Sequence, residues 1–480
     1  MNKKEKIFYF VLFVVFIVLS LLVGMTHEQW ADEAHAWMIA RDTSFYSLFF
    51  QYLHTDGHPA LWHLILKFFQ FIGVEYKHIY VISTIFSSAG VGIFLFKSNF
   101  KWYIKVLLPF SYFVFYQYTV VARGYCLILL LLSLIASIWD NRLKKCYLFT
   151  FYLILLMSCE AYTFMLAGMI YLILVYDYIK GKEKIKNSKS LLSCLIILPI
   201  FFILTVLYVY PISSNTFGAN GPIYYISDSF FTNYIEFEKL KLIWSFAIVI
   251  FIYWCYKKDF EKKKFFEMVF FLLPVFCFLY FKYYNVWHLG ILFLIFFFIL
   301  WIQKFNMSFY LNVFLSLCLM TQVFWSVYSS VYDINNNYAS SKDVANFIKK
   351  YNYESFDIYG ATFYESGINP YFDKNIFDNW DQNIGFFYWN TRNVFYKTTL
   401  SDKEYEMIIY SDIYLGMPAD FFQKFDLIKN DYNLYYFPAS TCAENFIYEP
   451  MGTYVYVLKK VDKIPYDSHL IENSNELFIQ

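Results

Sequence analysis

Charged residues are scarce in this 480-residue chain, since Asp, Glu, Lys and Arg make up only 16% of it. Soluble globular proteins usually carry about 25%. The hydrophobic residues gather in runs of roughly 17–25, the length that crosses a bilayer as a helix. The composition therefore excludes an ordinary soluble protein and predicts a polytopic α-helical membrane protein.

Arginine and paired cysteines are also scarce. Only four of the 39 basic residues are arginine, which together with abundant Phe, Tyr, Ile and Asn is typical of an AT-rich bacterial genome. The eight cysteines contain no CxxC pair, and only Cys442 lies in the polar C-terminal region, so neither a disulfide framework nor a zinc site is indicated. The net charge of +1 gives no reason to expect a nucleic-acid partner.

Eleven apolar runs are predicted to span the membrane. They cover residues 7–25, 79–96, 102–120, 124–139, 147–159, 162–179, 191–210, 242–256, 265–284, 287–303 and 308–328. The first run lacks a small-residue cleavage site, so we expect a retained helix rather than a signal peptide. Twenty basic residues fall on the side of the N-terminus and seven in the opposite short loops. Because cytoplasmic loops are rich in Lys and Arg, we predict a multi-pass cell-membrane protein with its N-terminus inside.

Residues 58–73, HPALWHLILKFFQFIG, are left out of this count. A helix of this length covers roughly 24 Å, which is short of the hydrocarbon core of about 30 Å. Counting it would also place every later lysine cluster outside. We therefore predict an amphipathic helix at the outer interface, one of two interfacial helices in a long outer loop over residues 26–78.

The pattern changes near residue 330. We predict a transmembrane domain over residues 1–329 and an extracytoplasmic α/β domain over residues 330–480, since about 150 residues suffice for one small domain. Within the second domain, residues 340–351 predict a helix capped by Ser341. Residues 356–362, 405–410 and 452–458 predict strands.

Most polar residues at the predicted membrane boundary fall on the outer side. They are Asp32, Glu33, His35, Arg41, His54, Asp56, His58, Arg123, Glu160 and His288. We predict an outward-facing cavity whose carboxylates act as a general base and whose cations hold a phosphate. Simpler structural explanations exist for some of them. Asp32 and Glu33 suit the first turn of a helix, and Arg123 suits a snorkelling position.

Four sequence elements follow one another on this predicted side. They are WADEAHAW at 30–37, GHPALWHLIL at 57–66, ARGY at 122–125 and an acidic hairpin at Glu160. In this order they resemble the GT-C glycosyltransferases over roughly residues 1–300, in particular the glycosyltransferase family 39 type. That group includes protein O-mannosyltransferases and the aminoarabinose transferases of lipid A. This chain has GHPA where the family more often has HPP.

The resemblance implies a GT-C-like fold and an inverting transfer reaction on the outer face of the membrane. The donor would be a polyprenyl-phosphate-sugar, and the acceptor a hydroxyl of a glycan, lipid or protein. Asp32 matches the catalytic carboxylate with Glu33 beside it, while His58, Arg123 and His288 match residues that meet the lipid phosphate. No cofactor is demanded, although the acidic cluster could hold a divalent metal.

Two other functions fit part of the pattern. A transporter or flippase for a lipid-linked sugar would use the same cavity without chemistry. It predicts broken helices and inverted repeats, neither of which is visible in the sequence. A membrane-anchored binding protein would place the function in residues 330–480 and leave ten further helices unexplained.

Overall fold

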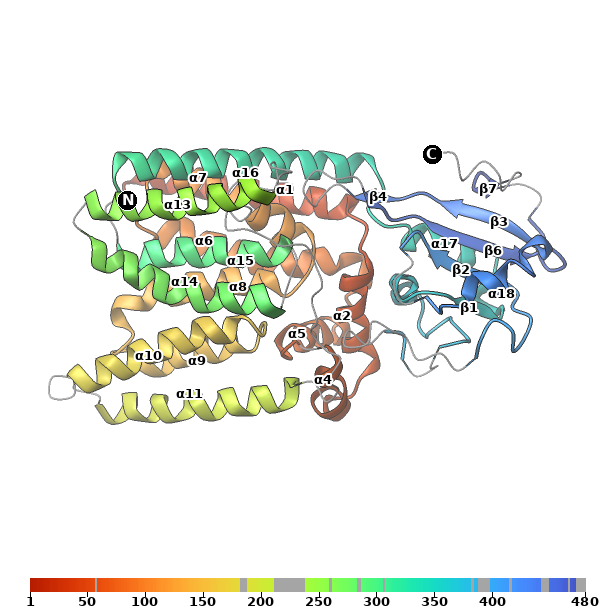
Figure 1. Cartoon of the computed structure of the whole chain (residues 1–480), viewed down its shortest axis with the longest axis horizontal. Helices are drawn as coiled ribbons and strands as arrows, with labels where there is room; N and C mark the ends of the chain where they lie inside the picture. Colours follow the sequence, from red (N-terminus) through yellow and green to blue (C-terminus); the bar gives the residue numbers. More distant parts are fainter. Residues whose placement is uncertain are drawn as a thin grey trace.

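The computed structural model contains a bundle of helices and a C-terminal unit built around a sheet (Figure 1). The N-terminus lies at the end of the bundle away from the C-terminal unit. The structure describes residues 1–56, 58–181, 188–210, 238–258, 261–282, 286–304, 307–380, 384–386, 398–413, 417–441, 449–464 and 467–471.

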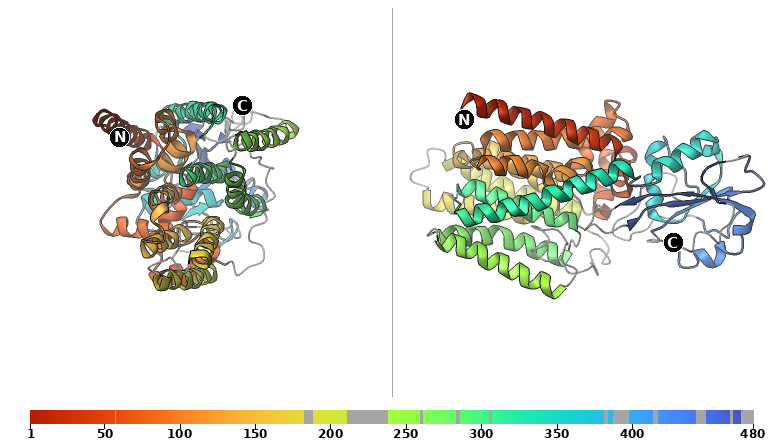
Figure 2. Two further views of the ribbon diagram at one scale, coloured as in Figure 1. Left: turned by 90° about the vertical axis from the view of Figure 1, so that its left-hand side faces the viewer. Right: turned by 90° about the horizontal axis from the view of Figure 1, so that it is seen from above.

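The long helices of the bundle run side by side (Figure 2). They are α1 (Lys3–Thr26), α6 (Ile79–Lys97), α8 (Tyr125–Ile138), α9 (Cys146–Met157), α10 (Thr163–Gly181), α11 (Ser188–Val209), α13 (Glu238–Lys258), α14 (Lys262–Lys282), α15 (Val286–Gln303) and α16 (Phe309–Asn335). Among the described residues, five helices are long and apolar enough to cross a membrane: Lys3–Thr26, Tyr76–Lys97, Thr163–Gly181, Lys189–Val209 and Phe309–Asn335. The chain is therefore a helical, membrane-associated protein, and this set is smaller than the predicted eleven spans.

The predicted span over residues 102–120 is not one continuous helix. It divides into α7 (Trp102–Leu107), a 3-10 turn η3 (Leu108–Phe110) and a π-helix η4 (Tyr112–Val120). Pro109 has no N–H with which to continue an α-helix, and the backbone of Ser111 is extended between the two pieces. The break brings the residues after η4 to the end of the bundle where α2 lies.

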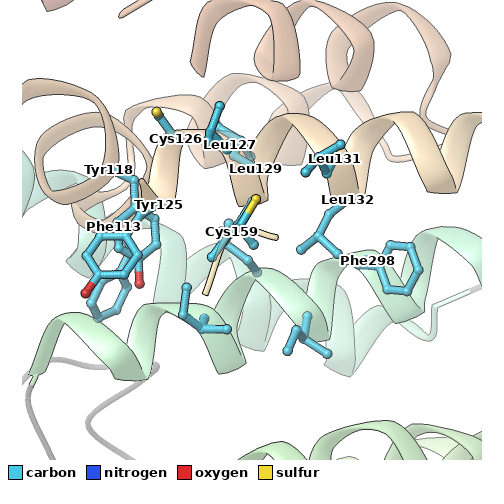
Figure 3. Close-up of a cluster of buried hydrophobic side chains, with 14 of the residues drawn as sticks. Phe113, Tyr118, Tyr125, Cys126, Leu127, Leu129, Leu131, Leu132, Cys159 and Phe298 are labelled. Carbon is cyan, nitrogen blue, oxygen red and sulfur yellow. The ribbon is translucent and has the colours of Figure 1, made fainter. Parts of the chain in front are cut away.

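Small residues let α6 approach its neighbours closely, as is typical of helices in membranes. The hydroxyls of Ser83 and Ser87 donate to backbone carbonyls of η4 at 2.6 and 2.9 Å. A Cβ on Gly90 would lie 2.9 Å from the backbone nitrogen of Leu130, so any side chain there would push α6 away from α8. Further along α8, Leu132 lies next to Phe298 of α15 in the buried apolar core (Figure 3).

Short helices lie at the end of the bundle nearest the C-terminal unit. They are α2 (Ala31–Asp42), α3 (Phe45–Ser47), η1 (Leu48–Tyr52), α4 (Leu53–Asp56), α5 (Leu61–Phe71) and η2 (Tyr76–His78). α5 has the amphipathic character predicted for it, because it buries Trp62 and Leu66 and exposes Phe68 and Phe71. α2 differs from the prediction of an interfacial helix. Residues 31–40 are all buried, because α2 lies between the bundle and the C-terminal unit (Figure 1).

The C-terminal unit has a five-stranded mixed sheet in the order β1-β2-β6-β3-β7. Its strands are β1 (Ile358–Gly360), β2 (Met407–Ser411), β3 (Tyr432–Phe437), β6 (Thr453–Leu458) and β7 (Leu470–Ile471), and a second small sheet pairs β4 (Ser440–Thr441) with β5 (Glu449–Pro450). β1 and β2 are parallel, whereas β6 is antiparallel to both β2 and β3. The predicted strands correspond to β1, β2 and β6, and β3 is not among them.

Two helices cover this sheet, and short 3-10 turns connect the rest. α17 (Ser341–Lys350) packs Val344 and Phe347 against one face, and α18 (Phe421–Phe425) packs Phe421 and Phe425 against the other. The 3-10 turns of the C-terminal unit are η6 (Tyr353–Ser355), η7 (Phe363–Gly367), η8 (Asn369–Tyr371) and η9 (Lys429–Asp431), whereas η5 (Trp139–Asn141) follows α8 in the bundle. The C-terminal unit is thus built from both strands and helices.

Ser341 is the first residue of α17 rather than its cap, and the hydroxyl of the preceding Ser340 contacts Met451 and Thr453 instead of the helix. The predicted domain boundary after residue 329 falls within α16, which ends at Asn335. Cys442 lies outside the described residues, and the seven cysteines in the described part of the chain are free.

Candidate active site

Several of the predicted site residues meet in a small cavity between α2, α5 and the α9–α10 hairpin. It has a volume of about 30 Å³ and is lined by Asp32, His35, Ala36, Asp56, His58, Pro59, Trp62, His63, Arg123, Gly124, Cys159 and Glu160. The backbone N–H of Leu61 donates to the carbonyl of Ser158 at 3.1 Å, which fixes the start of α5 against the hairpin. Ionisable groups buried at the end of an apolar bundle are costly and usually functional.

Asp32 and Arg123 form the closest ion pair in this cavity. Arg123 Nη1 donates to Asp32 Oδ2 at 2.7 Å. The aromatic rings of Tyr125 and Trp287 lie 5.1 and 5.8 Å from the guanidinium carbon, so Arg123 is also held by cation–π contacts. Burial raises the pKa of Asp32, and the charge of Arg123 opposes that rise. The site therefore presents a carboxylate with increased proton affinity next to a fixed cation.

Glu33, which the sequence places beside Asp32 in the predicted site, does not line the cavity. Its side chain is fully buried on another side of α2. Glu33 Oε1 accepts the backbone N–H of Ala122 at 2.7 Å, and Oε2 accepts the backbone N–H of Trp30 at 3.2 Å. Adjacent residues on a helix point about 100° apart, so only one of the two acids can face the cavity.

Glu33 also belongs to a buried charge network centred on His27. His27 Nε2 lies 3.1 Å from Glu33 Oε2, and His27 Nδ1 lies 2.8 Å from Asp333 Oδ2 near the end of α16. The hydroxyl of Tyr116 donates to the same Asp333 oxygen at 3.1 Å. Burial on its own would lower the pKa of His27, but the carboxylates of Asp333 and Glu33 raise it to about 10. A protonated His27 thus links α1, α2 and α16.

Asp56 contacts three histidines in the cavity. Its Oδ1 lies 3.0 Å from His35 Nε2, and its Oδ2 lies 3.0 Å from His63 Nε2 and 3.3 Å from His58 Nδ1. Burial alone would raise the pKa of Asp56, but His58 and the other imidazole contacts hold it well below its ordinary value. Burial lowers the pKa of His35. Asp56 is therefore an ionised acceptor that fixes the three rings.

His58 connects Asp56 to Glu160 in the α9–α10 hairpin. His58 Nε2 lies 3.3 Å from Glu160 Oε2. Burial would lower the pKa of His58, but Glu160 and Asp56 raise it to about 9, so His58 is a cation at neutral pH. Burial raises the pKa of Glu160, an effect that His58 and Arg123 oppose. A Cβ on Gly124 would lie 3.1 Å from Glu160 Oε1, so the residue after Arg123 has little room for a side chain.

The predicted site residues Arg41, His54 and His288 also lie away from the cavity lining. Arg41 bonds Asp42 and the carbonyls of Asn369 and Phe372, because it lies at the end of α2 that faces the C-terminal unit. His54 Nδ1 contacts the carbonyl oxygen of Tyr210 at 2.7 Å.

His288 is buried on α15 among aromatic rings and does not line the cavity. Its ring lies 5.5 Å from that of Tyr162 and 6.3 Å from that of Tyr125. Tyr125 also contacts Arg123, so His288 is separated from the ion pair by one aromatic side chain.

His63 lines the cavity but was not among the predicted site residues. It lies on the buried face of α5 with Trp62 and Leu66. A histidine on the apolar face of an amphipathic helix, five residues after His58, is the sequence signal that could have identified it.

The cavity contains groups that can accept a proton and groups that can hold an anion, namely Asp32 with the cations Arg123 and His58. Within the described ranges, no group of three or more His, Cys, Asp or Glu side chains is arranged to hold a metal ion. No protein-family model matches the chain, and no curated protein matches it at a significant level.

Proposed function

We propose that the protein is an integral-membrane glycosyltransferase that moves a sugar from a polyprenyl-phosphate-sugar to an acceptor hydroxyl. The observation that carries this proposal is the contact between Asp32 and Arg123 in a polar cavity at the end of an apolar bundle. A lipid-borne donor needs a site next to the membrane, its phosphate needs cations, and its acceptor needs a base. Asp32, Arg123 and His58 supply these groups in one place.

In the proposed reaction, the acceptor oxygen attacks the anomeric carbon while Asp32 takes the hydroxyl proton. The bond between the anomeric carbon and the phosphate oxygen breaks, and the lipid phosphate leaves with the electron pair. Attack from the face opposite the phosphate inverts the anomeric centre. Arg123 and the protonated His58 stabilise the phosphate as its charge increases. A phosphate leaves readily, so this role needs cations more than a general acid.

A transporter for a lipid-linked sugar is the second candidate. The interrupted segment α7–η3–η4 favours it, because transporters build their sites from discontinuous helices. Transporter sites lie near the midplane of the membrane, however, whereas this cavity lies at the end of the bundle beside α2. This position favours the transferase.

The test uses the purified chain in lipid nanodiscs and in sealed proteoliposomes. A panel of synthetic polyprenyl-phosphate sugars, radiolabelled in the sugar, is offered with glycan, lipid and protein fractions of a bacterial envelope. We expect label to reach one acceptor fraction with wild type and not with Asp32→Asn. Movement of intact donor between leaflets without transfer would support the transporter instead. Neither transfer nor movement with any donor would overturn both candidates.

We also propose eleven spans with the N-terminus in the cytoplasm and the C-terminal unit outside, supported by the distribution of basic residues. A reporter enzyme that works only outside the cytoplasm, fused after Gln480, should be active. A fusion that is active only with a cytoplasmic reporter would contradict this topology.

A further inference from the structure

A short segment of the C-terminal unit is buried in the core of the helical bundle. Ile384 and Phe386 are 8% and 2% exposed, and both belong to the apolar core of the bundle rather than to either apolar cluster of their own sheet. The C-terminal unit therefore contributes side chains to the part of the molecule that contains the cavity.

Polar contacts hold this segment against α2. The backbone N–H of Gly385 donates to Asp42 Oδ2 at 3.2 Å, and the side-chain amide of Asn369 donates to the Gly385 carbonyl at 2.9 Å. Arg41 bonds both Asp42 and the carbonyl of Asn369, so it links the two residues that hold Gly385. A Cβ on Gly385 would lie 2.2 Å from Met38 Cε, so a side chain at this position would require the end of Met38 to move.

The segment brings the ring of Phe386 to the cavity histidine His35. The two rings meet edge to face, with centroids 5.9 Å apart and planes at 78°. On its other side, Phe386 contacts the ring of Tyr52 at 5.1 Å. His35 in turn contacts Asp56 through Nε2 at 3.0 Å and lines the cavity. Phe386 thus contacts His35, a side chain that lines the candidate site.

We propose that the C-terminal unit completes the site through Phe386, a positioning residue that fixes the ring of His35 against Asp56. His35 rotates about two side-chain bonds, and its contact with Asp56 fixes one edge of the ring. An aromatic ring that meets it edge to face restricts this rotation. With His35 fixed, Asp56 keeps its contacts to His58 and His63, and the cationic His58 keeps its place near Arg123.

The first test does not depend on the proposed function. Purified wild type is treated with diethylpyrocarbonate, and modification of each histidine is quantified by mass spectrometry, with the exposed His78 as the reference. His35 is 3% exposed and should be protected. Phe386→Ala and Phe386→Leu should increase its modification several-fold, whereas Phe386→Tyr, which keeps the ring, should restore protection. Phe422→Ala is the matched control, because Phe422 is on the far side of the sheet unit and 41% exposed.

Equal His35 modification in wild type, Phe386→Ala and Phe386→Leu would overturn the proposal. Thermal melting of each variant is measured alongside. If Phe386→Ala does not fold, Phe386→Leu carries the test, since it keeps most of the buried apolar volume.

A second test rests on the proposed function and measures sugar transfer. Phe386→Ala should lower kcat with little change in donor KM. In a His35→Gln background it should cause no further loss, because residues that act through one another are not additive. Additive losses would overturn the proposal. If wild type transfers no sugar at all, the proposed function fails, while the labelling result still decides whether Phe386 positions His35.

Discussion

Glu33 and Ala122 form a buried hydrogen bond directly beside the ion pair of their chain neighbours, Asp32 and Arg123. The side chain of Glu33 accepts the backbone N–H of Ala122 at 2.7 Å, and the residue before Glu33, Asp32, forms an ion pair at the same distance with the residue after Ala122, Arg123. The buried bond sets the register between α2 and the loop after η4. The ion pair in the cavity is thus aligned by a contact outside it, and this arrangement separates the roles of the two acids.

Asp32→Asn should fold normally and lose turnover by at least about a hundredfold, because general-base assistance contributes about 10²–10⁴ in rate. Asn keeps the shape and an oxygen for Arg123 but cannot take the acceptor proton. Transfer assays and thermal melting on the same preparation test this. Asp177→Asn is the matched control, since Asp177 pairs with Arg142 at the other end of the bundle. Near-normal transfer by folded Asp32→Asn would end the catalytic assignment.

Arg123→Lys should raise the donor KM about tenfold or more. A bond to a charged group contributes about 1.5–3 kcal/mol, and 1.4 kcal/mol corresponds to a factor of ten. Lysine keeps the charge but loses the planar fork that suits a phosphate and the stacking on Tyr125 and Trp287. Initial rates over a range of donor concentrations measure the effect. Arg142→Lys, which alters a similar pair stacked on Trp139, should leave KM unchanged. An equal response of both variants would remove the phosphate assignment.

Glu33→Gln should behave differently from Asp32→Asn. It weakens the contact with His27, and hydrogen bonds to charged groups are worth about 1.5–3 kcal/mol, so we expect a lower melting temperature. Turnover should fall less than in Asp32→Asn, because Gln still offers an oxygen to Ala122. Glu75→Gln is the control, as Glu75 is exposed. The opposite pattern, full stability with lost turnover, would identify Glu33 as the base.

Stability should decrease at alkaline pH because of His27. Its pKa is about 10 in the folded protein and ordinarily 6.5. A group with a raised folded pKa contributes stability fully below its unfolded pKa and loses that contribution as pH rises through the folded value. The melting temperature of wild type should therefore fall between pH 7 and 10 more steeply than that of His27→Gln. His78→Gln, which alters an exposed ring, should follow wild type. Parallel curves for wild type and His27→Gln would show that the network carries no net charge stabilisation.

Much of the site could be predicted from the sequence because the order of the apolar runs fixes which loops share an end of the bundle. That reasoning brought together Asp32, His58, Arg123 and Glu160 from four separate segments. It could not decide which of two adjacent acids faces the cavity, since that depends on the rotation of α2. This rotation is set by the contact of Glu33 with a backbone N–H far along the chain.

Other features depended on packing that no local pattern reveals. Arg41 resembles a cavity cation in the sequence, yet it bonds carbonyls of a unit more than three hundred residues away. Pro109 makes the break in the span over 102–120 predictable from the sequence. The π-helical winding of η4 could not be predicted, because the residues Tyr112–Val120 have the composition of an ordinary apolar helix.

The contacts between α2 and the C-terminal unit restrict how substrates could reach the cavity. A swing of the C-terminal unit would break the bonds of Arg41 to the carbonyls of Asn369 and Phe372 and would withdraw Phe386 from the core of the bundle. Exposing a buried phenylalanine and losing a bond to a charged group each cost about 1.5–3 kcal/mol, which makes such a swing rare. We therefore expect the C-terminal unit to keep its position at this end of the bundle rather than to open as a hinged lid. In the proposed reaction, a donor carried by the membrane would then enter between helices of the bundle and would not pass the C-terminal unit.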